Sequence, residues 1–154
     1  MPFLNLICSA LTDQGVRYAI VGGHAVALHG AVRGTVDIDI VLVWDLKSLK
    51  SAEEALIGIG LVSRLPIDAD DVFHFRDEYV HNRNLIAWDF YNPSNPVEQV
   101  DIVITYNLKA KKTKNIETLG GSVKILSRKE LIAMKRASGR PQDLEDVKAL
   151  EKLK

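Results

Sequence analysis

Two aspartates that stand two positions apart, Asp37 and Asp39, interrupt the apolar segment 36–40. Side chains at this spacing on a strand point to the same face, so the sequence predicts that the two carboxylates lie side by side. Upstream, Gly22 and Gly23 follow an apolar run and precede a short helical pattern. Paired carboxylates near a glycine turn that can approach phosphate suit a divalent metal bound to a nucleoside triphosphate.

A magnesium site of this kind needs a further carboxylate from a neighbouring strand, because Mg²⁺ is held by a few carboxylates together with waters and phosphate oxygens. Asp101 is the best candidate, since its β-branched and apolar neighbours predict a rigid strand. Asp89, between Trp88 and Phe90, is the rival. Acidic residues also alternate with apolar ones on any half-exposed strand, and this interpretation stays open for each of these aspartates.

Polar residues around the aspartates and the glycine turn are candidates for phosphate binding. Backbone N–H groups at Gly22 and Gly23 can approach a phosphate, because no side chain blocks them. Arg33 can pair with a phosphate and Thr35 can donate a hydrogen bond to one, although a surface arginine and a strand-forming threonine are alternatives. His24 follows the glycine pair and either faces the nucleotide or caps the turn.

The elements that must position these residues follow from the hydrophobic periodicity. The pattern predicts helices over 3–14, 23–29, 47–58, 127–137 and 141–153, and strands over 17–21, 35–43, 60–65, 85–91, 99–105 and 123–126. A loop is predicted at 92–96, and the polar segment 66–83 has no assignment. Ser127 and Glu130 form a predicted capping box. We expect one α/β (α+β) domain over 1–154, a small mixed β-sheet flanked by helices.

The composition narrows the class of protein. The 20 basic and 20 acidic residues cancel, so overall charge neither favours nor excludes nucleic acid. The single cysteine, Cys8, excludes an intramolecular disulfide. We find no apolar run long enough for a membrane span and expect no signal peptide, hence no membrane partner and a cytoplasmic protein. A basic run comprises Lys109, Lys111, Lys112 and Lys114. It either contacts an RNA backbone or is simply solvated.

The glycine pair, the segment Val36-Asp37-Ile38-Asp39-Ile40 and Asp101 together resemble the nucleotidyltransferase superfamily, which has the DNA polymerase β-like fold. The form Gly-Gly-His-Ala…Arg-Gly-Thr-Val-Asp-Ile-Asp is similar to abortive-infection toxin-type and to small antibiotic nucleotidyltransferases. The resemblance implies transfer of a nucleoside monophosphate from an NTP to a hydroxyl of RNA (a tRNA end), of a protein or of a small molecule. It also implies that Asp37, Asp39 and Asp101 are catalytic and bind Mg²⁺ or Mn²⁺.

The pattern Lys135-x4-Arg140-x2-Asp143-x2-Asp146 resembles a motif of the toxin-type group, in which a lysine and an aspartate assist the catalytic centre. The resemblance implies that Lys135 offsets triphosphate charge and that Asp143 orients Lys135 or Arg140. It also implies a toxin–antitoxin relationship with a cognate antitoxin-like partner. Two alternatives stay open: acidic residues favoured by a helix N-terminus, and a catalytically inactive nucleotide- or partner-binding module of the same fold. The sequence does not determine the oligomeric state.

Overall fold

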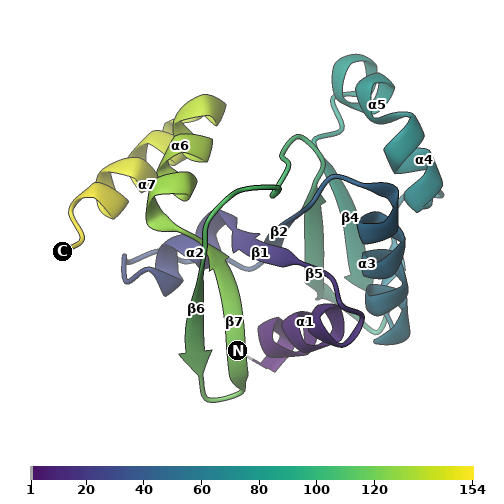
Figure 1. Cartoon of the computed structure of the whole chain (residues 1–154), viewed down its shortest axis with the longest axis horizontal. Coiled ribbons are helices and arrows are strands. Elements are labelled where there is room, and N and C mark those ends of the chain that lie inside the picture. Colours follow the sequence, from purple (N-terminus) through teal and green to yellow (C-terminus); the bar gives the residue numbers. More distant parts are fainter. Residues whose placement is uncertain (1) are drawn as a thin grey trace.

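The computed structural model describes residues 2–154, which form seven helices and a seven-stranded mixed sheet (Figure 1). The helices are α1 (Pro2–Asp13), α2 (Gly22–Leu28), α3 (Leu46–Gly58), α4 (Ala69–His74), α5 (Arg76–Arg83), α6 (Arg128–Ser138) and α7 (Pro141–Glu151). The strands are β1 (Tyr18–Val21), β2 (Ile38–Leu42), β3 (Val62–Ser63), β4 (Ala87–Asn92), β5 (Asn95–Val103), β6 (Thr113–Thr118) and β7 (Gly121–Leu126). The predicted mixed sheet flanked by helices is therefore confirmed. No helix within 2–154 has the length and apolarity to cross a membrane.

The sheet has the order β3-β4-β5-β2-β1-β7-β6. Strand β2 runs parallel to β5 and antiparallel to β1, while β1 runs parallel to β7. The two hairpins, β4–β5 and β6–β7, lie on either side of this centre. Strands distant in sequence are thus neighbours at the middle of the sheet, where the two central parallel pairings need long crossover connections.

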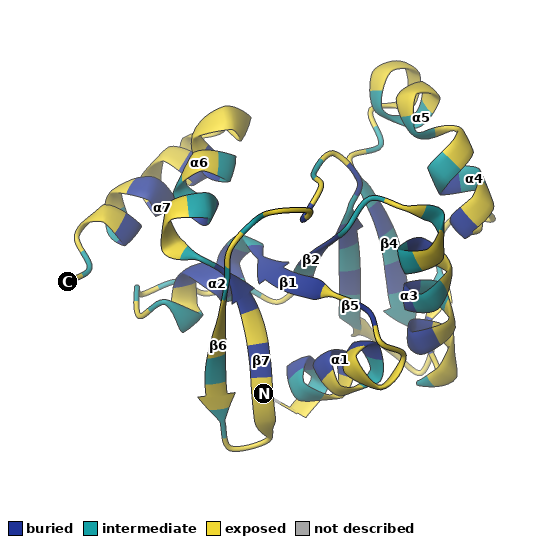
Figure 2. Cartoon of the chain, in the orientation of Figure 1, coloured by how far each residue is buried: buried dark blue, intermediate teal, exposed yellow. Residues whose placement is uncertain are grey.

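One face of the β4–β5 hairpin is covered and the other is partly open (Figure 2). Trp88 and Phe90 are fully buried, whereas the alternating residues Asp89 and Tyr91 are only half-buried. Period-two burial of this kind places the aromatic side chains in the core. The same alternation leaves the aspartate on the partly open face, where its side chain is 23% exposed.

The structure corrects several predicted elements. The unassigned segment 66–83 contains α4 and α5, and an unpredicted capping box between Asp68 and Asp71 begins α4. The loop predicted at 92–96 is too long, because β4 ends at Asn92 and β5 already begins at Asn95. Only a two-residue turn separates the strands, and there the Asn92 side chain accepts the Ser94 N–H at 3.0 Å. Strand β6 was not predicted, because it is a polar strand at the sheet edge with little apolar alternation.

Candidate active site

Asp39 and Asp101 lie on neighbouring parallel strands and are direct register partners. Directly paired residues present their side chains on the same face, so the two half-buried carboxylates are adjacent. Burial raises the pKa of Asp39, and the charge of Asp37 raises it further. Burial likewise raises the pKa of Asp101 to about 7, with added repulsion from Asp39 and Asp89. A divalent cation would stabilise the charged form of this pair, so these oxygen donors fit Mg²⁺ or Mn²⁺.

The strand predicted over 35–43 is too long at its beginning, because β2 begins only at Ile38, so Asp37 and Asp39 do not both lie on the strand. Asp37 is exposed and lies in a bend that precedes the strand, although its charge acts on Asp39. Within residues 2–154, no group of three or more His, Cys, Asp or Glu side chains is arranged to hold a metal ion. A third ligand from Asp37 therefore stays a prediction, while Asp39 and Asp101 are the carboxylates that the sheet places together.

The glycine pair lets the turn after β1 come close to the carboxylate segment. Gly22 has φ +68°, and a Cβ at this position would overlap the Asp39 carboxylate. At Gly23, a Cβ would lie 2.7 Å from the Cβ of Thr35. Each glycine thus leaves space for the side chain of a predicted site residue. The positions of the glycines in the sequence did not indicate this close packing. A role for their N–H groups in phosphate binding stays a prediction.

His24 and Thr35 contact the segment that carries the aspartates. His24 Nε2 lies 3.4 Å from the carbonyl oxygen of Val36, and the Thr35 hydroxyl donates to the carbonyl of Asp37 at 3.5 Å. The two interactions join these side chains to backbone carbonyls just before the bend and within it. They support a positioning role for the two residues in this structure.

Asp89, the rival third carboxylate, is the antiparallel register partner of Asp101 but lies one strand further from Asp39. Its Oδ2 accepts from Arg64 Nε at 2.6 Å, so a cation already faces it. Arg64 Nη2 also donates to Gln99 Oε1, and Gln99 Nε2 donates to Asp101 Oδ1 at 3.2 Å. Sequence reasoning missed Gln99, although its position two residues before Asp101 predicts the same strand face.

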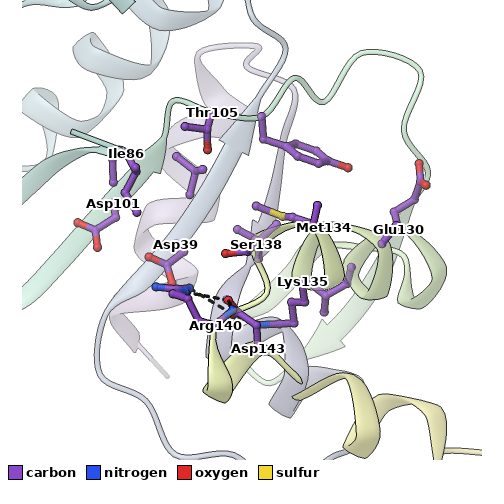
Figure 3. A pocket seen from close by; sticks show the side chains of 18 of the residues that line it. Asp39, Ile86, Asp101, Thr105, Glu130, Met134, Lys135, Ser138, Arg140 and Asp143 are labelled. Atoms are coloured by element: carbon purple, nitrogen blue, oxygen red, sulfur yellow. Dashed lines mark hydrogen bonds and ion pairs between the residues drawn. The ribbon is translucent and has the colours of Figure 1, made fainter. Parts of the chain in front are cut away.

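A pocket of about 740 Å³ opens between the sheet and α6, and Figure 3 shows Asp39 and Asp101 at one side of it. Gly22 lines the pocket beside Asp39, and Arg140 extends toward Asp39 from the α6–α7 connection (Figure 3). Lys111 is the member of the basic run that lines the pocket. The space can therefore admit a ligand that reaches both carboxylates.

The C-terminal motif forms a network of ion pairs between α6, α7 and the segment before β2. Lys135 Nζ lies 2.8 Å from Asp146 and 3.7 Å from Asp143. Asp146 also accepts from Arg33 Nε at 3.0 Å, and Asp143 accepts from Arg140 Nε at 2.8 Å. Burial alone would raise the pKa of both carboxyls, but these cations outweigh it and hold both pKa values below the usual range. Asp143 was predicted to orient Lys135 or Arg140, and it contacts both.

No protein-family model and no curated protein matches this chain. Several solved structures do. The lincosamide antibiotic adenylyltransferase LnuA, bound to lincomycin, aligns with 99% of this chain and 97% of its own at TM-score 0.62 and 16% identity. ANT(2″)-Ia in complex with adenylyl-2″-tobramycin aligns with 97% of this chain and 86% of its own, at TM-score 0.61 and 13% identity. This chain has the nucleotidyltransferase fold.

A third structure with this nucleotidyltransferase fold is an antigenic nucleotidyltransferase-like protein from Paracoccidioides brasiliensis. It matches 97% of this chain and 73% of its own length, at TM-score 0.57 and 18% identity. The expected resemblance to the nucleotidyltransferase superfamily is therefore confirmed at the level of the fold. The predicted site residues are tested by none of these similarities and stay predictions.

Within this nucleotidyltransferase fold, Lys135→Met is expected to destabilise the chain by about 3 kcal/mol, because it leaves two buried carboxylates short of a cation. Urea unfolding measures the loss. The exposed Arg136–Glu151 pair on the same helix pair supplies the control, and Arg136→Met should cost no more than about 1 kcal/mol. Depressed carboxyl pKa values stabilise the fold above the unfolded pKa of about 4, so the effect of Lys135→Met should shrink as pH falls below that value. Equal costs for both variants would contradict a structural role for the buried network.

Proposed function

We propose that this protein transfers a nucleoside monophosphate from an NTP to a hydroxyl acceptor and releases pyrophosphate. The observation that carries the proposal is the in-register pair of Asp39 and Asp101 beside Gly22, at the edge of a pocket of about 740 Å³. Two adjacent carboxylates next to a turn without side chains suit a metal-bound triphosphate. A cytoplasmic location is part of the proposal.

Each residue has a distinct role in this reaction. Asp39 and Asp101, joined by Asp37 from the bend, would hold Mg²⁺ or Mn²⁺. When bound, such an ion neutralises phosphate charge and lowers the pKa of an attacking hydroxyl. In this proposal Asp101 also receives the proton of the acceptor hydroxyl. The N–H groups of Gly22 and Gly23 face the phosphates.

The remaining predicted phosphate ligands have different surroundings. Thr35 packs against Gly23 at the turn, where its hydroxyl is close to the carboxylate segment. Arg33 and Lys135 both donate to Asp146, so their charges are partly satisfied within the protein. They act on a triphosphate mainly through the field of the whole network rather than by direct contact.

We propose a small molecule as the hydroxyl acceptor. The pocket has the size of a small-molecule site, and Ile86, Val103 and Met134 give it apolar walls. Two of the structurally similar proteins were solved with a small molecule, lincomycin in one and adenylyl-2″-tobramycin in the other. Three of the four lysines of the basic run lie outside the pocket lining, which weakens the case for RNA.

Measuring the rate of transfer at different ionic strengths tests whether the acceptor is a small molecule or RNA. Transfer to a small acceptor should change little between low and high salt, whereas transfer to RNA should fall steeply as counterions compete for the phosphates. A toxin–antitoxin role has no support from the pocket. It would require a protein or RNA acceptor together with a partner that inhibits the reaction.

Calorimetric titration of each NTP, with and without Mg²⁺, tests the proposal. We expect the wild type to bind an NTP in a Mg²⁺-dependent manner and the Asp37→Ala/Asp39→Ala double variant to lose that binding. Thermal unfolding of both proteins controls for loss of fold. A wild type that binds no NTP would contradict the proposal and favour a catalytically inactive, partner-binding module.

A further inference from the structure

The connection between α6 and α7 places Arg140 at the pocket. Gly139 ends α6 in the left-handed region, with φ +67°, and Pro141 begins α7 immediately afterwards. The left-handed glycine reverses the chain and the proline starts a new helix, so Arg140 is held at a tight corner. From this corner its side chain extends toward Asp39 (Figure 3).

Arg140 is fixed along one edge of its guanidinium and open along the other. Nε and Nη2 donate to the two oxygens of Asp143 at 2.8 and 3.2 Å, which is a bidentate pair. These bonds leave the Nη1 group outside the pairing. The side chain is 68% exposed, whereas that of Asp143 is 3% exposed. Arg140 therefore presents free N–H groups on a side chain whose orientation is already set.

Lys135 has the opposite surroundings. Its side chain is 7% exposed, and its ammonium faces both Asp143 and Asp146. Withdrawing this charge would leave two buried carboxylates short of a cation, so Lys135 is not free to turn toward a ligand. It instead offsets the charge of Asp143, which would otherwise cancel that of Arg140.

Among the ion-paired groups of this network one positive charge is in excess, because Arg33, Lys135 and Arg140 form ion pairs with only two carboxylates, Asp143 and Asp146. The most exposed of these three cations is Arg140, since the side chain of Arg33 is only 25% exposed. Asp39, toward which Arg140 extends, belongs to the acidic group proposed to hold a metal ion (Figure 3). A triphosphate whose metal lies at that acidic group brings its non-bridging oxygens to the exposed guanidinium edge.

We propose that Arg140, not Lys135, is the side chain that binds the triphosphate, and that Lys135 is a buried positioning residue behind it. This inference rests on the nucleotidyl-transfer function proposed above. Of the two cations in the C-terminal motif, Arg140 then binds the ligand and Lys135 supports it. Inorganic tripolyphosphate with Mg²⁺ is the probe that follows, because it contains the recognised group and no base.

We expect Arg140→Gln to weaken the binding of Mg²⁺-tripolyphosphate and of Mg²⁺-NTP by about 10- to 100-fold, the usual effect of losing a charge-assisted pair. Arg140→Lys keeps the charge but loses the forked guanidinium group, so its affinity for both ligands should lie between those of the wild type and of Arg140→Gln. Arg136→Gln removes the same charge from the exposed face of α6, where Arg136 pairs with Glu151, and should leave affinity unchanged. Lys135→Met, measured well below its melting temperature, should lose less affinity than Arg140→Gln.

The inference and the proposed function fail in different ways. If the wild type binds Mg²⁺-NTP, Asp39→Asn abolishes that binding and Arg140→Gln does not change it, the function stands and the inference is overturned. A folded Lys135→Met variant that loses more affinity than Arg140→Gln overturns it as well. A wild type that binds neither ligand rejects the proposed function itself.

Discussion

Asp39→Asn should lower the rate of nucleotidyl transfer by at least about a thousandfold, because it removes a charged metal ligand at the centre of the site. The substitution keeps the size of the side chain, so the packing against Gly22 and the pairing of β2 with β5 are retained. Turnover of a labelled NTP in the presence of an acceptor measures the effect. Magnesium titration of both proteins should show that metal dependence is lost together with activity.

Asp89→Asn is the matched control, because it makes the same change on the same face of the sheet, one strand beyond Asp101. Asp89 is already paired with Arg64, so its replacement should reduce activity by no more than about tenfold, as expected for a supporting position. If Asp89→Asn abolished transfer while Asp101→Asn did not, the assignment of the third carboxylate would be reversed.

Gly22→Ala should reduce transfer by about a hundredfold or more, since the added methyl group occupies the position of the Asp39 carboxylate. Displacing a catalytic group by about 1 Å is sufficient for a loss of that size. The positive φ adds a backbone cost of about 1–2 kcal/mol to the free energy of folding. Steady-state kinetics and urea unfolding measure the two effects separately.

Gly15→Ala separates backbone strain from the steric clash. Gly15 has φ +70°, almost the same as Gly22, but a Cβ there would meet no atom within 4 Å. We expect Gly15→Ala to destabilise the fold by the same 1–2 kcal/mol, approximately, and to leave the activity of the folded protein unchanged. Equal losses of activity in the two variants would show that the clash with Asp39 is not the cause.

The local sequence pattern was sufficient to predict those elements in which apolar and polar residues alternate with a short period. Alternation around Asp101 predicted a strand, and the apolar run before Gly22 predicted another, both of which the structure contains. The side chain of Ser127 accepts from the Glu130 N–H, as half of the predicted capping box requires. Such features depend on hydrogen bonds and burial within a few residues, so one segment of sequence contains all the necessary information.

Local pattern failed over the polar segment 66–83 and over the edge strand β6. The segment 66–83 forms α4 and α5, although α5 has a strongly polar composition and no buried residue. The edge strand β6 pairs along its whole length with β7. The hydrogen bonds to β7 hold β6 in place, and the sequence of β6 alone does not indicate them. Backbone pairing of this kind is independent of side-chain polarity, so periodicity could not reveal it.

The sequence by itself determined the chemistry of the candidate site: carboxylates, a glycine pair and a C-terminal set of opposite charges. Only the tertiary structure decided which of these residues meet. It paired Asp39 with Asp101 through the register of β2 and β5, left Asp37 in a bend, and enclosed Lys135 while exposing Arg140. The physical reason is that charge and residue type are properties of single positions, whereas adjacency and burial depend on strands and helices far apart in the chain.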